Sequence, residues 1–451
     1  MKRRHFLSRV GAGATLATLG GLSRGLVPAA RADAGSDYRA LVCVFLFGGM
    51  DNHDVVIPYE RSAYEEWARL RGGLLTAMAT PRTLDNLLPL GSSGPLAAQA
   101  LPAELSGIHG LFQSGQAALL GNVGPLLEPV TRRTFEDDSA RLPSRLFSHN
   151  DQQSTWMGGR PEGAQYGWGG LFLDALGDLN AAPELGGITT GDAQLFLTGR
   201  RTVPYAVSPG GAPAVEALTA YDDAALEAAL RAELRGEGTT RTHLLERDLA
   251  GMARAGLDAN ARYDAATRGV PALTTLFPPD GLGAQLGAVA RTIQAREALG
   301  ACRQLFIVGI GGFDTHSNQA RSLPTLQRRV DLGITAFHQA MVELGLDRQV
   351  TLFTASDFGR TLAPNDDGTD HGWGAHHFVV GGAVRGGRLY GGLPEATLGH
   401  DHDAGNGRLI PQLSVEQLAA PLGRWMGMDD AALATALPQL SAFPEPPPDF
   451  I

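Results

Sequence analysis

The chain has few of the residues that mark a disulfide-rich or membrane-spanning protein. Only two of its 451 residues are cysteines, Cys43 and Cys302, each at the start of a strand-like run. They could form a disulfide if those strands are neighbours, but two buried free thiols are at least as good an interpretation. No segment after residue 34 is long and apolar enough for a transmembrane helix, so we expect no membrane anchor in the mature chain.

Basic residues are also in the minority. The chain has 37 Lys and Arg residues against 47 Asp and Glu residues, which gives a net charge of −10. Removal of residues 1–34 would take away six basic residues and one acidic residue, so the net charge would change from −10 to −15. An acidic chain with scattered basic residues is a poor candidate for nonspecific nucleic-acid binding, and we expect no nucleic-acid partner.

The first 34 residues have the order of a twin-arginine export signal. Arg3 and Arg4 precede Phe6, a mildly apolar run follows, and a small-x-small cleavage site ends at Ala34. A chance basic start before an amphipathic helix fits this order less well. We therefore predict a cleaved signal at 1–34, the twin-arginine translocase as a partner during export, and a periplasmic or secreted location. This route carries folded proteins, commonly with a cofactor in place, which favours a bound metal.

Four apolar runs indicate buried strands, at residues 40–47, 117–123, 304–309 and 349–354. Between the third and fourth runs, apolar residues recur at three- and four-residue spacing, which is typical of a helix. Strand, crossover helix and strand predict an α/β fold with a mostly parallel central sheet flanked by helices. Functional residues should lie at the carboxyl ends of its strands.

The remaining segments predict a single domain over residues 35–451. Residues 205–300 are rich in Ala, Leu, Arg and Glu, and indicate a helical insertion. We also expect a helix near 97–113, a glycine-rich hairpin at 386–392 and a helix near 415–425.

Acidic residues follow three of the four strands. Asp51 follows the first, where a metal ligand and a residue that caps a glycine turn are equally good interpretations. Asp314 and His316 follow the third in Gly-Phe-Asp-Thr-His, and a metal or catalytic role is favoured because a histidine serves no capping purpose. These regular positions predict one composite site.

The fourth strand ends at Asp357 and leads into the segment with the densest group of possible ligands. That segment contains Asp370, His371 and His376, among further carboxylates and glycines. Carboxylate oxygens and imidazole nitrogens together suit a divalent metal such as Zn, Mn, Ca or Mg. We expect Asp357 and either His371 or His376 to be ligands, and the exposed carboxylates Asp366 and Asp367 to belong to a solvated loop.

Two further residues are candidates for catalysis. Ser148 opens a predicted helix, where a hydroxyl can cap the helix or act as a nucleophile in a positive potential. Arg360 lies three residues after Asp357 and could hold an anionic substrate group. The His400 to Asp403 run has a metal-like composition but no strand behind it, so a solvated loop is the better interpretation.

As an ordered set, these motifs resemble the exported bacterial family catalogued as domain of unknown function 1501. The resemblance spans essentially the whole mature chain and is carried by the leader and by residues 45–51, 148–153, 312–319, 356–361, 369–374 and 381–388. That family in turn resembles the alkaline phosphatase and sulfatase superfamily of metal-dependent α/β hydrolases. Phe358 departs from the superfamily, which often has a second histidine ligand there.

The resemblance implies an alkaline-phosphatase-like fold and a metal-dependent hydrolase of phosphate or sulfate esters. Ser148 would be the nucleophile and Arg360 would orient an anionic ester. One or two divalent ions would be held by six residues: Asp51, Asp314, His316, Asp357, His371 and His376. The alternative is a noncatalytic envelope protein that binds a glycan or a protein partner on a degenerate hydrolase scaffold.

Overall fold

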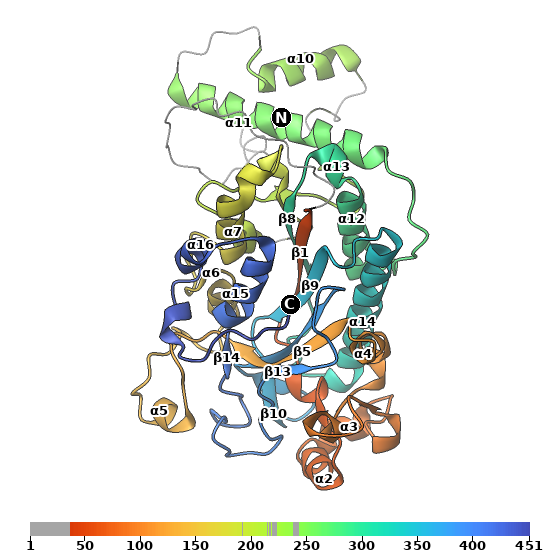
Figure 1. The fold of residues 1–451 in the computed structure, drawn as a ribbon, viewed down its shortest axis with the longest axis vertical. Coiled ribbons are helices and arrows are strands. Elements are labelled where there is room, and N and C mark those ends of the chain that lie inside the picture. Colours follow the sequence, from red (N-terminus) through yellow and green to blue (C-terminus); the bar gives the residue numbers. More distant parts are fainter. Residues whose placement is uncertain (1–36, 192, 214, 216–217, 219–222, 238–242) are drawn as a thin grey trace. The chain divides into compact units, whose positions relative to one another are not determined.

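A nine-stranded, mostly parallel sheet forms the centre of the fold (Figure 1). The structure, a computed structural model, describes residues 37–191, 193–213, 215, 218, 223–237 and 243–451. The predicted α/β class with a mostly parallel sheet is confirmed. The predicted export signal lies outside the described residues.

The strands of the main sheet follow the order β13-β5-β12-β9-β1-β8-β6-β7, and β14 pairs with β5. Only β12 runs antiparallel to its neighbours, β5 and β9. The main-sheet strands are β1 Arg39–Leu46, β5 Ala117–Gly124, β6 Gly187–Thr189, β7 Tyr205–Ala206, β8 Arg303–Ile310, β9 Val350–Ser356, β12 Ala375–Val380, β13 Leu389–Gly391 and β14 Leu413–Ser414.

Two small sheets lie outside the main one. One joins β2 Ile57–Pro58, β3 Leu88–Pro89 and β4 Gln99–Leu101. The other pairs β10 Arg360–Pro364 with β11 Thr369–His371, and its register sets Arg360 opposite His371. This second sheet therefore brings two of the predicted functional residues together.

The described α-helices alternate with the strands along much of the chain. They are α2 Arg61–Leu70, α3 Gly72–Ala77, α4 Ser106–Gln113, α5 Arg132–Glu136, α6 His149–Gly158, α7 Trp168–Leu176, α8 Gln194–Leu197, α10 Ala224–Leu234, α11 Leu244–Arg268, α12 Gly281–Gln294, α13 Arg296–Leu299, α14 Gln319–Glu343, α15 Val415–Met426 and α16 Asp430–Ala436. None of the described helices combines the length and apolar character needed to cross a membrane.

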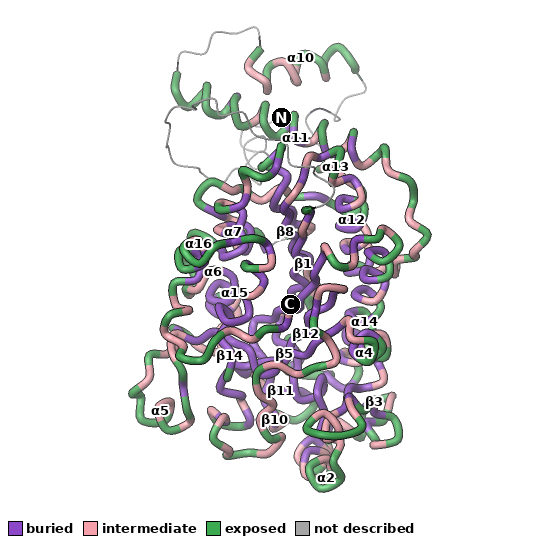
Figure 2. Tube along the Cα trace, in the orientation of Figure 1, coloured by how far each residue is buried: buried purple, intermediate pink, exposed green. Residues whose placement is uncertain are grey.

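Both faces of the sheet are buried, as the continuous apolar strand runs require. Alternate side chains of β1 belong to different cores: Val42 and Val44 to one, and Cys43 and Phe45 to the other. Helices α4, α12 and α14 cover the first face, whereas α6, α7, α15 and α16 cover the second (Figure 1). Figure 2 shows the strands as the most continuously buried part of the chain.

The register of β1 brings three strand ends side by side. Leu46, the last residue of β1, pairs with Ile310 of β8 on one side and Ser356 of β9 on the other. The loops that carry Asp51, Asp314 and Asp357 therefore begin at one edge of the sheet. The repeated position of acidic residues directly after strands predicted that these loops would lie side by side.

Several local predictions were wrong. The predicted helix at 97–113 is broken, because Pro102 follows β4 and the α-helix begins only at Ser106. The glycine-rich segment is not a hairpin, since β13 pairs in parallel with β5. The cysteines, in contrast, follow the free-thiol interpretation: β1 and β8 are neighbours, but Cys43 lies opposite Ile307 rather than Cys302.

The predicted helical insertion at 205–300 contains elements of two kinds. β7 extends the main sheet, and α12 supplies Leu282, Leu286 and Val289 to the core. Helices α10 and α11 lie between them in sequence, and the N-terminal part of α11 exposes Leu245 and Leu249.

One acidic residue is buried in the second face of the sheet. Glu416, in the first turn of α15, is 8% exposed, and its Oε2 atom has no hydrogen-bond partner. Burial raises the pKa of Glu416 from 4.5 to about 8, although the backbone N–H groups of Leu440 and Gln439 oppose the shift. The folded chain therefore holds a proton that the unfolded chain releases above pH 4.5.

We predict that Glu416→Gln removes a pH-dependent loss of stability. Because the folded pKa lies above the unfolded one, the wild type loses stability as the pH rises from about 4.5 through about 8. Urea unfolding at pH 5.5 and pH 8 should show a loss in the wild type that exceeds the loss in the variant by on the order of 2 kcal/mol. Equal losses in the two proteins would contradict the burial of an uncompensated acid.

Candidate metal centre

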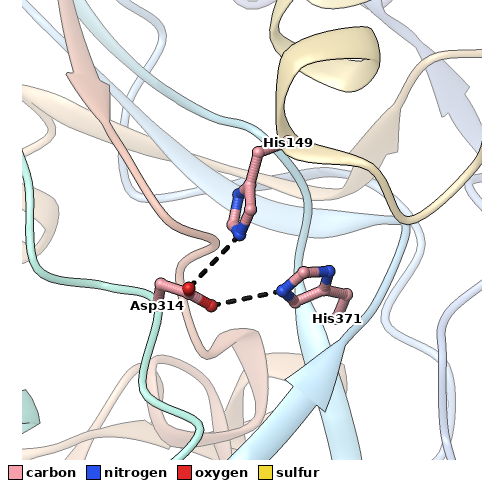
Figure 3. A group of neighbouring side chains, drawn as sticks. All are labelled: His149, Asp314 and His371. Atoms are coloured by element: carbon pink, nitrogen blue, oxygen red, sulfur yellow. Dashed lines mark hydrogen bonds and ion pairs between the residues drawn. The ribbon is translucent and has the colours of Figure 1, made fainter.

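Three side chains from separate parts of the chain converge beside the strand ends (Figure 3). His149 is the first residue of α6, Asp314 lies in the loop after β8, and His371 is the last residue of β11. Each offers one ligand atom, and these atoms all lie within 4.8 Å of one another. Two imidazole nitrogens and a carboxylate at this spacing can hold one metal ion.

The orientation of His149 is fixed by a carboxylate behind it. Its Nδ1 lies 2.6 Å from Oδ2 of Asp357, which also accepts a hydrogen bond of 2.9 Å from Gln153. Since Asp357 can only accept when ionised, His149 Nδ1 must be the donor. In the neutral imidazole, which is the form that binds metal, the buried Nε2 atom carries the lone pair. It has no hydrogen-bond partner and lies 3.4 Å from Asp314.

His371 is held in the same way by a backbone carbonyl. Its Nδ1 lies 2.6 Å from the carbonyl oxygen of Phe147, and its Nε2 lies 3.2 Å from Asp314 Oδ1. Phe147 has a φ of 72°, a conformation that costs free energy in a non-glycine residue and is found where the surrounding structure enforces it. In this conformation the backbone carbonyl of Phe147 is directed at Nδ1 of His371.

Asp314 is held by Arg360 and by a close approach of the first strand's loop. The fully buried guanidinium of Arg360 donates to Asp314 Oδ1 at 2.9 Å and to the carbonyl of Gly48 at 3.0 Å. Gly48 has a φ of 113°, and a Cβ there would lie 2.2 Å from the backbone nitrogen of Asp314. Only glycine permits this contact.

A third histidine lies beside the group. His316 Nε2 is 3.1 Å from Asp314 Oδ1 and 2.8 Å from His371 Nε2, and its Nδ1 lies 3.4 Å from Asp370. Its side chain is exposed, as is that of Asp314. The arrangement therefore offers up to four donors, three imidazoles and one carboxylate.

The electrostatic balance keeps Asp314 ionised and His371 neutral. Burial alone would raise the pKa of Asp314, but the hydrogen bond and charge of Arg360 outweigh it and lower that pKa. Burial lowers the pKa of His371, whereas the hydrogen bond to Asp357 raises the pKa of His149. An ionised carboxylate beside a neutral imidazole is the state in which both bind metal.

Phe358 forms the floor beneath the two histidines. Its ring centroid lies 4.8 Å from that of His149 and 4.6 Å from that of His371. The residue that departs from the superfamily pattern thus packs against both imidazoles, and offers no donor to an ion.

Two predicted ligands lie apart from this group. Asp51 is fully buried and pairs with Arg71, and it also accepts hydrogen bonds from Gln319 and the backbone of His53. His376 is buried in β12, where its Nδ1 accepts a hydrogen bond of 3.0 Å from the backbone of Asn122. Burial lowers the pKa of His376 to about 3. Asp51 thus joins the loop after β1 to the ends of α2 and α14, and His376 joins β12 to β5.

Other predicted residues lie near the group in different positions from those expected. Asp357 contacts Nδ1 of His149, the ring nitrogen that does not face Asp314. The Oδ1 atom of Asp357 is buried without a partner. Arg360 is engaged by Asp314 and backbone carbonyls, not turned toward a free anion. Ser148 is the N-cap residue of α6, but its hydroxyl donates to Asp151 at 2.8 Å and does not cap the helix.

His149 was not among the candidate ligands expected from the sequence. Its signal was its place at the start of the helix that Ser148 opens, but the identity of its partner Asp357, 208 residues later, could not be read from the chain. The His400 to Asp403 run is a braced loop: Asp403 is buried and accepts hydrogen bonds from the backbone of Gly399, Gly405 and Gly407.

Comparison with known proteins gives one match over most of the chain. The family described as "Protein of unknown function (DUF1501)" matches residues 38–440. No curated protein matches the chain in sequence.

Two solved structures are distantly similar. One is described as Ps i-CgsB in complex with k-i-k-neocarrahexaose, with a TM-score of 0.36, 10% identity, and coverage of 87% of this chain and 73% of that chain. The other is the C-terminal periplasmic domain of EcEptC from Escherichia coli in complex with Zn, with a TM-score of 0.26, 10% identity, and coverage of 78% and 75%. Likenesses this distant support no statement about the fold or activity of this chain.

We predict that Asp51→Asn destabilises the protein without lowering its metal content. The substitution leaves the buried guanidinium of Arg71 without its counter-charge, a change that costs about 3–5 kcal/mol. Urea unfolding of the metal-free protein measures the loss, and Asp366→Asn, at an exposed loop position, is the control. A drop in bound metal with unchanged stability would instead make Asp51 a ligand.

Proposed function

This chain belongs to the DUF1501 family, and we propose that it is an exported, metal-dependent hydrolase of phosphate or sulfate esters. One observation carries the proposal: two imidazole Nε2 atoms, each with its other ring nitrogen tied to an acceptor, face the carboxylate of Asp314. Partners of this kind orient histidines toward metals in proteins. His149, His371 and Asp314 are the proposed ligands, and His316 is the fourth donor.

The donor set fits a transition metal better than calcium or magnesium. Imidazole nitrogens suit Zn²⁺ and its neighbours, whereas Ca²⁺ and Mg²⁺ prefer oxygen ligands. The buried Nε2 of His149 also has no hydrogen-bond partner, an uncommon state that a bound ion would relieve. We therefore infer one divalent ion, with zinc the best match.

When bound, such an ion would act as a Lewis acid, polarising an ester oxygen and stabilising negative charge on it. The chain's own residues hold the geometry. Asp357 and the Phe147 carbonyl orient the two imidazoles, and Arg360 keeps Asp314 ionised and in place. Arg360 is thus a positioning residue in this proposal.

Ser148 is the proposed nucleophile. It directly precedes His149, and its hydroxyl is half-buried and oriented by the hydrogen bond to Asp151. The two hydroxyl-bearing residues within this helix already donate to backbone carbonyls, Ser154 to that of Pro161 and Thr155 to that of Asp151. Attack by the Ser148 hydroxyl oxygen on phosphorus or sulfur would break the bond to the substrate's alcohol oxygen, and the released alcohol would take up the hydroxyl proton. Water would then break the resulting serine ester, which frees phosphate or sulfate and restores Ser148.

The Arg3-Arg4 leader supports export by the twin-arginine translocase and a periplasmic or secreted location. This assignment is part of the proposal, because the leader lies outside the described residues.

A second candidate function is metal-dependent binding without catalysis. Two observations favour it: Arg360 is already engaged by Asp314 and backbone oxygens, and Phe358 occupies the floor beneath both histidines. Such a protein would hold a glycan or a protein partner, and would contain the ion without turning over esters.

We predict that His149→Ala and His371→Ala each lower zinc affinity by more than about 100-fold. Loss of a ligand should exceed the roughly 10–100-fold effect of losing an outer partner. Elemental analysis and competition with a chelator measure the affinity, and His109→Ala, at a half-buried histidine distant in sequence from the group, is the matched control. Unchanged metal content in both variants would remove the basis of the proposed function.

We predict that Ser148→Ala lowers turnover of aryl phosphate or aryl sulfate esters at least about 1000-fold while metal content stays constant. Ser154→Ala is the matched control, because that hydroxyl is bonded to Pro161. A metal-loaded wild type that turns over neither ester supports the binding function instead. Turnover that survives in Ser148→Ala excludes the serine as nucleophile.

A further inference from the structure

A small cavity lies at the end of α6 opposite His149. It has a volume of about 60 Å³, and its lining includes Trp156 and Gly159 from this end of the helix, Trp168 from α7 and Glu416 from α15. A water molecule needs about 10–15 Å³ of such space. The cavity can therefore hold a group of a few heavy atoms.

The acid in this cavity is only partly compensated. The backbone N–H groups of Leu440 and Gln439 act on Glu416, but its Oε2 atom is buried with no hydrogen bond, and Glu416 has no ion-pair partner among the described residues. The indole N–H of Trp168 does not serve it, since Trp168 Nε1 donates to the carbonyl of Trp156 at 3.2 Å. A buried carboxylate with an unpaired oxygen is costly unless something compensates it.

The helix end that faces Glu416 is also negative. The last carbonyls of a helix lack intrahelical partners and carry the negative end of its dipole. α6 ends at Gly158, and a Cβ on the following Gly159 would lie 3.8 Å from Glu416 Oε1. A carboxyl group and a helix C-terminus thus lie on one small cavity, and both favour a cation.

The other residues that line the cavity favour an organic cation over a metal ion. The rings of Trp156 and Trp168 attract organic cations through their π faces but do not ligate metal ions. Carbonyl and carboxylate oxygens accept N–H hydrogen bonds. The second ionisable residue of the lining, Arg160, is exposed and forms no ion pair with Glu416 in this structure.

We propose that this cavity is a second binding site, which takes a primary ammonium group with Glu416 as its counter-charge. The ligand is a small free amine or the amino end of a longer molecule. This assignment does not depend on the metal centre or on ester hydrolysis. A cation in the cavity would favour the ionised form of Glu416, whose pKa burial otherwise raises to about 8.

The test follows the Glu416 carboxyl by ¹³C NMR in wild-type protein labelled at glutamate, with Glu416→Gln used for assignment. Methylammonium chloride should lower the pKa of Glu416 by at least about one unit, because the bound cation stabilises the carboxylate. Tetramethylammonium, which has no N–H donor, and sodium at equal ionic strength should not. Equal shifts with all three cations would reduce the effect to bulk charge and overturn the proposal.

Isothermal titration at pH 8.5 gives the second readout. Methylammonium should bind the wild type, bind Glu416→Gln at least about tenfold more weakly, and bind Arg160→Ala as well as or better than the wild type. Binding that survives in Glu416→Gln, or that is lost in Arg160→Ala, would overturn the assignment. The wild-type NMR titration still decides the question if Glu416→Gln does not fold. A comparison of the binding of free lysine with that of acetylated lysine shows whether the site takes the amino group or another part of the ligand.

Discussion

The hydrogen bond between His149 and Asp357 is the interaction on which the metal centre depends. This contact of 2.6 Å directs Nδ1 of His149 at the carboxyl group, and so turns Nε2 toward Asp314. Asp357 can serve this role because β9 ends beside β1, which sets the carboxylate at the edge where α6 begins. The register of the sheet thus determines the orientation of the His149 ring, although His149 and Asp357 are more than 200 residues apart in sequence.

Rigidity around the other two side chains comes from backbone contacts. Phe147 is held in an unfavourable conformation and presents its carbonyl to His371. Gly48 allows the loop after β1 to touch the backbone of Asp314, and Arg360 ties that loop to the carboxylate. The same adjacency explains why Asp51 and Arg71 form a buried pair nearby: the strand-end loops need internal counter-charges where water is excluded.

The sequence predicted the features that depend on the periodicity of apolar residues. It did not predict the features that depend on pairing between residues far apart in the chain. Apolar runs located β1, β5, β8 and β9 to within a few residues, and the acidic residues at three strand ends indicated one composite site. Asp314, His316 and His371 were correctly expected near one another. Nothing local distinguished Asp51, neutralised by Arg71, from a ligand, and nothing local showed that Asp357 would serve His149. The cysteines illustrate the same limit, since neither the pairing of their strands nor its register could be read from the sequence.

The most direct test of the central claim is a crystal structure of the zinc-loaded protein with anomalous difference data collected at the zinc edge. We expect one strong peak at about 2.0–2.2 Å from His149 Nε2, His371 Nε2 and a carboxylate oxygen of Asp314. His149 Nδ1 should remain bonded to Asp357. A peak elsewhere, or a zinc ion bound there without either imidazole, would contradict the account.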